Sequence, residues 1–251
     1  MRRIFAFASA VLFTCSLAQP SFAANFTPAQ KSEMETLIHD YLMEHPEILQ
    51  DMATKLDVKQ KAAEVSARTT NLKAHAREIF HEPLDAVIGN PKGNVTMVEF
   101  MDYNCGWCKK SVKEVQALVE QDKNVRVVLK EFPIFGAGSE YAAKAAMAAV
   151  KQGKYWQLHQ ALFASEGKVT AEVVDQIAAE QGLDVAQMKA DMNDPAIAAN
   201  IQKTNILAQT LLFTGTPAFI VDDQVSPGYL PIDGLQAMLA GVRANGGCKI
   251  C

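Results

Sequence analysis

The sequence predicts an α/β domain preceded by a helical segment, and three observations support this prediction. A strand, a helix and a second strand follow one another over residues 95–132, a block of helical segments comes next, and a short hairpin with a final helix closes the fold. The chain has 251 residues, of which 49% are hydrophobic, enough for one substantial core. The strand-helix-strand pattern predicts a parallel pair of strands.

The first turn of this unit carries a Cys-x-x-Cys motif. An apolar run at 95–101 indicates a buried strand, and the pattern at 109–120 indicates an amphipathic helix. Cys105 therefore lies at a helix start, where unpaired N–H groups and the helix dipole stabilise a thiolate. Such settings lower a thiol pKa from about 8.5 into the range of roughly 3.5 to 7.5. Cys108, one turn later, faces inward and can close or resolve a disulfide with Cys105.

Two other interpretations of this pair remain open from the residues alone. One is half of a zinc site, but zinc needs about four ligands, and no second Cys or His pair lies at a usable spacing nearby. The other is an inert structural disulfide. The order strand, Cys-x-x-Cys, helix favours a reactive pair. We therefore expect neither a metal nor a cofactor at Cys105 and Cys108.

The N-terminal residues predict a cleaved signal peptide over residues 1–23. A basic start precedes an apolar run at 4–17, and Ser21-Phe-Ala23 provides a small-residue cleavage site. A membrane anchor is the alternative, but this run is shorter than the roughly 20 residues that cross a bilayer. We expect export to the periplasm.

Charge and cysteine usage agree with an exported protein. Cleavage would remove two of the 24 basic residues, leaving 22 minus 28 acidic ones, or −6. Such a charge argues against nucleic acid or an anionic membrane as a partner. Four cysteines would remain, in two Cys-x-x-Cys pairs. An exported protein whose few cysteines all have this spacing is expected to handle disulfides.

Residues 24–82 predict a helical segment without a core of its own. Thr27-Pro-Ala-Gln30 combines an N-cap, a proline at N1 and a capping-box glutamine. Apolar positions at helical spacing follow, and they need a partner. We expect this segment to form a homo-oligomer; an intrachain lid is the alternative. The positions of the first stripe are Met34, Leu37, Ile38, Tyr41 and Leu42.

Residues 83–247 form the predicted catalytic domain. Residues 83–94 indicate a connection with a short apolar patch at Val87-Ile88, and 125–132 indicate the second strand. Helical segments fill about 139–212 as an insertion. A hairpin at 214–225 and a helix at 232–244 end the domain, and a tail at 248–251 carries the second cysteine pair.

Three motifs give this order a family resemblance. They are Glu-Phe-Met-Asp-Tyr-Asn-Cys-Gly-Trp-Cys at 99–108, Lys-Glu-Phe-Pro at 130–133 and Gly-Thr-Pro-Ala-Phe at 215–219. With them, residues 83–244 resemble the DsbA-like periplasmic disulfide oxidoreductases, which have a thioredoxin fold with an inserted helical domain. The N-terminal segment is similar to that of members such as the ScsC-type proteins.

The resemblance implies roles for residues beside the motif. Cys105 matches the nucleophile and Cys108 the buried resolving thiol. Thr216 and Pro217 match the loop beside the active site whose proline is cis, which would present the Thr216 backbone to an extended substrate.

A buried acid is the other implied site residue. Glu99 matches a carboxylate beneath the disulfide, where burial would raise its pKa and let it relay the Cys108 proton. Lys130 on the neighbouring strand is its expected charge partner, with Glu131 as the other candidate. A purely structural charge pair is the alternative. The pair Gly106-Trp107 lacks the histidine of the strongest oxidases, so a less oxidising disulfide is expected.

Cys248 and Cys251 form the possible second redox pair. They follow Gly246-Gly247, which suggests a flexible arm, and no helix follows to lower a thiol pKa. A local disulfide without function and metal capture by the tail remain open, beside electron transfer to Cys105 and Cys108 or to a neighbouring molecule. The five histidines are interpreted as surface or helix-face residues.

These observations predict an exported thiol:disulfide interchange protein. It would form or isomerise disulfides in unfolded or misoxidised exported proteins through Cys105 and Cys108, with a membrane redox partner and no cofactor. A different class remains open, namely a chaperone that holds copper or another soft metal through its thiolates.

Overall fold

The computed structural model describes residues 26–251, so the predicted signal peptide lies outside the described residues. The chain divides into two compact units after Val58. This division falls inside the predicted helical segment at 24–82, because Leu72, Ile79 and Phe80 belong to the core of the second unit. In the described part of the chain, no helix has the length and apolar character to cross a membrane.

The described residues of the first unit form helix α1 (Pro28–Glu44) and the beginning of α2 (Glu47–Ala74). The predicted capping box at the start of α1 is confirmed: the Gln30 N–H donates to Thr27 Oγ1, and the Thr27 N–H donates to Gln30 Oε1 at 3.0 Å. No residue of α1 is buried. Leu37 is 70% exposed and Ile38 54%, so the predicted apolar stripe has no partner within this unit.

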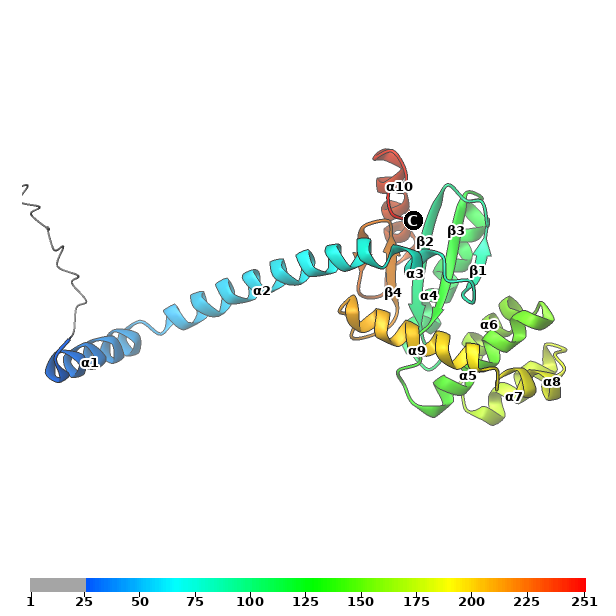
Figure 1. The fold of residues 1–251 in the computed structure, drawn as a ribbon, viewed down its shortest axis with the longest axis horizontal. Coiled ribbons are helices and arrows are strands. Elements are labelled where there is room, and N and C mark those ends of the chain that lie inside the picture. The colour runs from blue at the N-terminus through cyan, green and yellow to red at the C-terminus, as the bar shows by residue number, and fades with distance from the viewer. Residues whose placement is uncertain (1–25) are drawn as a thin grey trace, which may run out of the picture. The chain divides into compact units, whose positions relative to one another are not determined.

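A five-stranded sheet in the order β1-β3-β2-β4-β5 forms the centre of the second unit (Figure 1). The predicted parallel pair is confirmed as β2 beside β3, and the predicted hairpin as β4 with β5. β1 pairs with β3 and β4 with β2, both antiparallel. The strands are β1 (Ala86–Gly89), β2 (Val95–Met101), β3 (Val125–Glu131), β4 (Ala218–Val221) and β5 (Gln224–Ser226).

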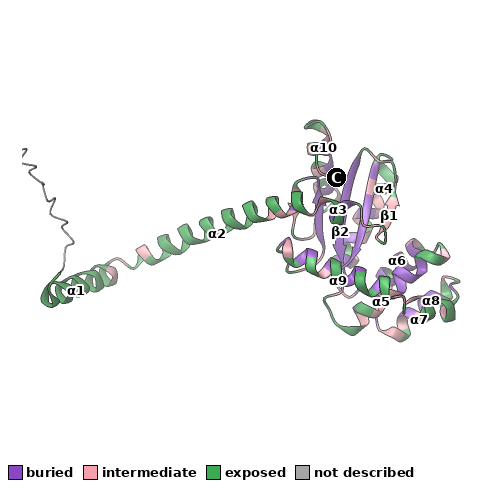
Figure 2. Ribbon diagram, in the orientation of Figure 1, coloured by how far each residue is buried: buried purple, intermediate pink, exposed green. Residues whose placement is uncertain are grey.

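Two hydrophobic layers cover the two faces of this sheet. Every residue of β2 is buried, as expected for a continuous apolar run in a covered strand (Figure 2). Met97 and Met101 face a layer that includes α4 (Gly106–Gln121) and α10 (Ile232–Ala244), whereas Val98 and Phe100 face a layer that includes the end of α2 and α3 (Ala76–Phe80). Alternation along the strand separates these layers.

The predicted helical insertion is confirmed between β3 and β4. Its helices α7, α8 and α9 begin at the side-chain caps Thr170, Asp184 and Asp194. The helices are α5 (Ala137–Ala149), η1 (Val150–Gln152), α6 (Tyr155–Ala164), α7 (Ala171–Glu180), α8 (Val185–Asp191) and α9 (Pro195–Thr210).

One element differs from the sequence prediction. Val87 and Ile88, expected in a connection, lie in β1, which pairs with β3 over residues 86–89. The strand is short and lies at the sheet edge, so its two faces alternate between half-buried and exposed, and it gives only a weak apolar pattern.

Candidate active site

A loop held by one buried carboxylate places Cys105 at the end of β2. Asp102 is 1% exposed and accepts hydrogen bonds from the Asn104 N–H at 2.7 Å and the Ser139 hydroxyl at 2.7 Å. Its other oxygen accepts from the N–H groups of Ile134 at 2.7 Å and Phe135 at 3.0 Å. Four donors from three chain segments thereby fix the turn before the cysteine.

Asn104 connects the same loop to the helical insertion. Its amide donates to the Val169 carbonyl at 3.0 Å, and its oxygen accepts from the Val169 N–H at 2.8 Å. Gly138 passes so close that an added Cβ would lie 2.3 Å from the Val169 carbonyl oxygen, so a larger residue there would displace this contact. Sequence reasoning missed Asp102 and Asn104, although Asp-x-Asn after a strand is a recognisable turn signal.

The two thiols of the motif have opposite properties. Cys105 is the N-cap of α4, and hydrogen bonding from the Cys108 thiol, aided by Thr216 and the N–H groups of Cys108 and Trp107, lowers its pKa to about 6 against the opposing effect of burial. Burial raises the pKa of Cys108, and the neighbouring charges of Glu99 and Cys105 add to this. At neutral pH the thiolate therefore resides on Cys105.

The loop before β4 lies against Cys105. The Thr216–Pro217 peptide bond is cis, as predicted. The Cys105 thiol donates to the Thr216 carbonyl at 3.1 Å. The Thr216 hydroxyl is buried and has no hydrogen-bond partner among the described residues, which leaves its proton available to a thiolate on Cys105.

Glu99 lies beneath the cysteines on β2. It is 3% exposed, and its carboxylate accepts a hydrogen bond from the Ser111 hydroxyl at 2.8 Å. Burial raises its pKa to about 7; the Ser111 hydrogen bond opposes the shift, and the charge on Cys105 adds to it. Sequence reasoning missed Ser111, a polar residue three positions after Cys108 on the inward face of the helix, where that position itself is a signal.

The predicted pairing of Lys130 with Glu99 is wrong. In the parallel register Glu99 lies beside Leu129, and Lys130 lies beside Phe100, so the two charged side chains emerge on opposite faces of the sheet. Lys130 forms a buried ion pair with Asp85. Burial raises the pKa of Asp85 although Lys130 opposes the shift.

Glu131, the other candidate, belongs to a separate buried cluster. Its carboxyl group accepts hydrogen bonds from the hydroxyls of Tyr103 and Tyr155, each at 3.0 Å. His159 lies 3.1 Å from the Tyr103 hydroxyl and is 2% exposed, so its interpretation as a surface or helix-face residue is wrong. Burial lowers the His159 pKa to about 3, which keeps the ring neutral. His159 lies on the one buried face of α6, at the helical spacing of Tyr155, Leu158, Leu162 and Phe163, so apolar periodicity could have indicated its burial.

An exposed aromatic surface adjoins Cys105. Trp107 is 59% exposed, and its ring lies 5.4 Å from that of Tyr229. The Lys110 ammonium lies 4.4 Å from the Tyr229 ring centroid and 5.5 Å from that of Trp107. The Tyr229 hydroxyl donates to Glu114 at 2.8 Å, which fixes the ring. This surface can contact a peptide next to the reactive sulfur.

The C-terminal pair is docked against the sheet, so the predicted flexible arm is wrong. Cys248 and Cys251 form a disulfide. Gly246 and Gly247 both have positive φ and turn the chain back, and the Gly247 N–H donates to the Val242 carbonyl at 3.0 Å. The tail lies beside Asp222, at the opposite end of β4 from Pro217. The two ends of β4 are four residues, or about 13 Å, apart. This distance prevents disulfide exchange between Cys248/Cys251 and Cys105/Cys108 of the same chain.

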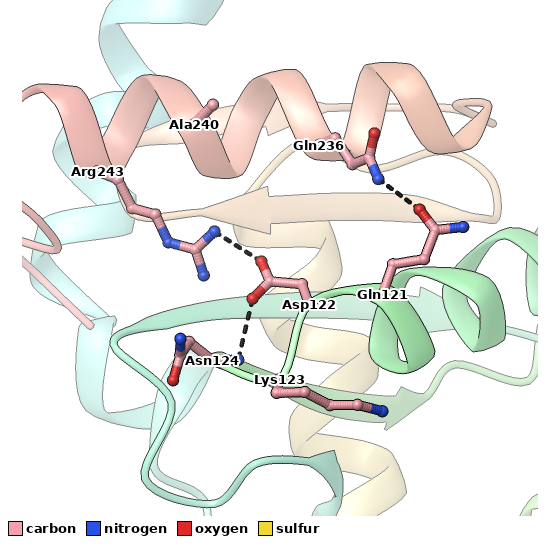
Figure 3. Close-up of a pocket in the computed structure, with 7 residues that line it drawn as sticks. All are labelled: Gln121, Asp122, Lys123, Asn124, Gln236, Ala240 and Arg243. Carbon is pink, nitrogen blue, oxygen red and sulfur yellow. Dashed lines mark hydrogen bonds and ion pairs between the residues drawn. The ribbon is translucent and has the colours of Figure 1, made fainter.

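A surface hollow lies between the end of α4 and α10 (Figure 3). It is separate from Cys105 and Cys108. Arg243 forms an ion pair with Asp122 at 2.6 Å, and Gln236 donates to Gln121 at 2.9 Å. The hollow lies at the C-terminal end of α4, whereas Cys105 lies at the N-terminal end of that 16-residue helix. It therefore takes no part in the cysteine site.

A thiolate at a helix start, a cis-proline loop and a thioredoxin-like sheet define a thiol:disulfide oxidoreductase. Residues 96–240 match the family model of the DSBA-like thioredoxin domain, and residues 30–63 match the copper resistance protein ScsC N-terminal domain. Because the first match spans more than half of the chain, this protein belongs to the DSBA-like thioredoxin family.

Solved structures agree with this assignment. The chain is 46% identical to a thioredoxin-like oxidoreductase from Silicibacter pomeroyi, with a TM-score of 0.66 and coverage of 67% of this chain and 97% of that one. It is 26% identical to Proteus mirabilis ScsC in a transitional conformation, with a TM-score of 0.65 and coverage of 88% and 99%. The second match includes the N-terminal segment as well as the catalytic domain.

A curated relative matches this chain over only part of its own length. The chain is 28% identical over 163 residues to the Na⁺/H⁺ antiporter NhaA 3 of Salinispora tropica, covering 64% of this chain. This match spans only 25% of the length of the antiporter.

Proposed function

We propose that this protein is an exported thiol:disulfide interchange protein that forms or isomerises disulfides in unfolded or misoxidised exported proteins. The observation that carries the proposal is the pairing of Cys105, whose pKa is lowered to about 6, with Cys108, whose pKa is raised, beside the cis-proline loop. The Cys105 sulfur can therefore attack a disulfide or act as a leaving group, whereas Cys108 stays protonated until it resolves the mixed disulfide.

In the isomerising direction, the Cys105 thiolate attacks one sulfur of a substrate disulfide. A mixed disulfide forms, and the other substrate sulfur leaves as a thiolate. That thiolate can attack another substrate disulfide, and a later attack on the mixed disulfide releases Cys105 with no net transfer of electrons. Alternatively, Cys108 attacks Cys105, which leaves the substrate reduced by two electrons and the protein oxidised.

Disulfide formation is the reverse of that second route. A substrate thiolate attacks the sulfur of Cys105 in the oxidised pair, and Cys108 leaves and takes up a proton. A second substrate thiolate then displaces Cys105, and two electrons remain on the protein. A membrane redox partner would remove these electrons and restore the disulfide.

Proton movement at Cys108 is assigned to Glu99. Cys108 is 1% exposed, so bulk water has little access to its proton. Glu99 has a pKa of about 7 and can therefore both accept and return a proton near neutral pH. Ser111 donates to one carboxylate oxygen and orients the group. Lys130 has no place in this relay, because it lies on the other face of the sheet.

Substrate would bind along the loop before β4. The Thr216 backbone next to Cys105 suits an extended peptide, and the Trp107 and Tyr229 rings offer an apolar contact beside it. Cys105 is only 4% exposed, so a substrate disulfide must approach closely along this surface.

The N-terminal helices support a homo-oligomer. Exposed apolar residues continue from α1 into α2, where Leu49 is 62% and Met52 60% exposed. Such a stripe on helices without a core is typical of an association surface. We therefore propose residues 1–23 as a signal peptide, 24–82 as the oligomerisation segment, 83–247 as the catalytic domain and 248–251 as the C-terminal tail, in a protein of the periplasm.

Substitution of the nucleophile tests the catalytic proposal. Cys105→Ser is expected to reduce insulin reduction and the refolding of a scrambled substrate to buffer levels. Cys108→Ser is the matched variant: it should retain attack and accumulate mixed disulfides that are visible on non-reducing gels. Unchanged activity of Cys105→Ser in both assays would contradict the proposal.

Light scattering tests the association of the first unit. The chain from residue 24 onward is expected to be oligomeric, and a chain that begins at residue 59 is expected to be monomeric, since the second unit has its own core. If both chains were monomeric, the proposal of a homo-oligomer would be contradicted, and the alternative that residues 24–82 form an intrachain lid would be favoured.

Metal storage at Cys105 and Cys108 has less support. Among the described residues, no group of three potential His, Cys, Asp or Glu ligands includes either thiol, so the ion would have to be one that two thiolates can hold, such as copper(I). The chaperone alternative would require stoichiometric metal bound through this pair, together with a lack of exchange activity.

A further inference from the structure

The second cysteine pair converges with a buried carboxylate. Asp222 follows β4 in the hairpin turn, has a positive φ of 54° and is 3% exposed. One ligand atom from each of Asp222, Cys248 and Cys251 lies within 4.8 Å of the others. Two thiol sulfurs and one carboxylate oxygen form a ligand set that zinc accepts.

The surrounding backbone builds this cluster in advance. The N–H groups of Lys249 and Ile250 donate to Asp222 Oδ1, each at 2.8 Å, and thereby orient the carboxylate. Cys248 packs against one hydrophobic layer of the sheet and Cys251 against the other. The three groups are therefore held by the fold, and hydrogen bonds to the carboxylate act as the outer-shell support that metal sites use.

The separations suit a tetrahedral ion. With Zn–S near 2.3 Å and Zn–O near 2.1 Å, a sulfur and an oxygen ligand lie about 3.6 Å apart. Cys248 Sγ lies 3.5 Å from Asp222 Oδ1. Two zinc-bound sulfurs lie about 3.8 Å apart, and the Cα atoms of Cys248 and Cys251, 5.7 Å apart, allow this once the disulfide opens.

We propose that the reduced Cys248 and Cys251 thiolates bind Zn²⁺ together with Asp222. Exchange with a protein disulfide of another molecule, which accepts the two electrons and becomes a dithiol, closes the Cys248–Cys251 disulfide and releases the ion. The carboxylate oxygen favours zinc over copper(I), which prefers soft ligands alone. A water molecule would complete the four-coordinate shell. This proposal goes beyond the exchange function at Cys105 and does not rest on it.

Opening the site is an ordinary exchange reaction. A dithiol donates two electrons to the Cys248–Cys251 disulfide and becomes a disulfide itself, and the two thiols formed lose their protons when zinc binds. The donor is a protein dithiol from another molecule, and the Cys105/Cys108 pair of a second copy has the required chemistry. Within one chain the two pairs lie at opposite ends of β4 and cannot meet.

Zinc titration tests the site without interference from the first pair. The chain from residue 24 onward, carrying Cys105→Ser and Cys108→Ser, is reduced with a phosphine and titrated with Zn²⁺ against a chromophoric chelator. We expect one zinc per chain in the reduced protein and none in the oxidised protein. Absence of stoichiometric zinc in the reduced, folded protein would overturn the proposal.

Substitution of Asp222 tests whether its carboxylate is a zinc ligand or whether the two thiolates bind zinc alone. Asp222→Asn retains a hydrogen-bond acceptor and tolerates the positive φ, and it should weaken zinc binding at least about tenfold. Asp223→Asn, at the exposed neighbouring carboxyl group, is the matched control and should leave affinity unchanged. Equal affinity in Asp222→Asn and Asp223→Asn would overturn the role of Asp222, and circular dichroism verifies the fold of each variant.

Discussion

Two Cys-x-x-Cys pairs with the same spacing occupy opposite ends of one sheet and have different chemistry. Cys105 caps a helix, lies against the cis-proline loop and has a buried acid beneath it. Cys248 and Cys251 come after the end of α10, close a disulfide and lie beside the hydrogen-bonded carboxylate of Asp222. Spacing alone therefore allows a disulfide, whereas the surrounding backbone and charges decide whether a thiol becomes a nucleophile or a ligand.

The largest expected effect is on stability. It comes from Lys130, whose charge supports the fold and does not influence Cys105 and Cys108. Lys130→Met removes one partner of a buried ion pair and should lower the free energy of unfolding by about 3 to 5 kcal/mol. The pH dependence of Cys105 reactivity should be unchanged, because Lys130 lies on the opposite face of the sheet. Urea unfolding and alkylation rates measure both quantities, and exposed Lys92→Met is the control.

Glu99, beneath Cys105 and Cys108, should give the protein a pH-dependent stability. Its pKa is about 7 in the folded protein against 4.5 for an ordinary glutamate, so its stabilising contribution is present below about pH 4.5 and is lost as the pH rises through 7. The loss amounts to about 3 kcal/mol. The difference between the unfolding curves of the reduced wild type and Glu99→Gln should follow this pH course; a constant difference would contradict the assignment.

The same substitution should make the first pair a poorer exchanger. Without a carboxylate to accept the Cys108 proton, resolution of a mixed disulfide should slow about a hundredfold at pH 7. Stopped-flow release of a chromophoric thiol from Cys105 measures this step. Glu120→Gln, on the exposed side of α4, should retain the wild-type rate, and an equal loss in both variants would exclude a specific relay.

Alkylation of the fully reduced protein compares the two pairs directly. The rate at Cys105 should rise with pH, reach half its maximum near pH 6 and then remain level, because its thiolate forms at about that pH. At pH 6 it should exceed the rates at Cys248 and Cys251 about tenfold, after allowance for the weaker nucleophilicity of a low-pKa thiolate. Mass spectrometry of the labelled peptides determines each rate.

The features that sequence predicted well are those encoded by local patterns. The apolar run at 95–101 and the apolar spacing at 232–244, followed by Asn245-Gly246, predicted strand and helix limits that agree with β2 and α10. The cis bond at Pro217 followed from the family motif. These features depend on neighbouring residues or on a fixed motif, so a single sequence contains them.

The features that sequence could not predict depend on register and packing. Lys130 and Glu99 lie on neighbouring strands, but only the observed register shows that their side chains emerge on opposite faces. Gly246 and Gly247 suggested flexibility, yet their positive φ values form a turn that docks the tail.

Trp107 gives this molecule an intrinsic optical probe. The chain has two tryptophans. Trp107 lies between the reactive cysteines and is 59% exposed, whereas Trp156 stacks on buried His159 with ring centroids 5.1 Å apart. Emission from Trp107 should change when its neighbouring sulfurs are oxidised, while Trp156 provides a steadier background. Fluorescence of the unlabelled protein can therefore report the redox state of the first pair during turnover.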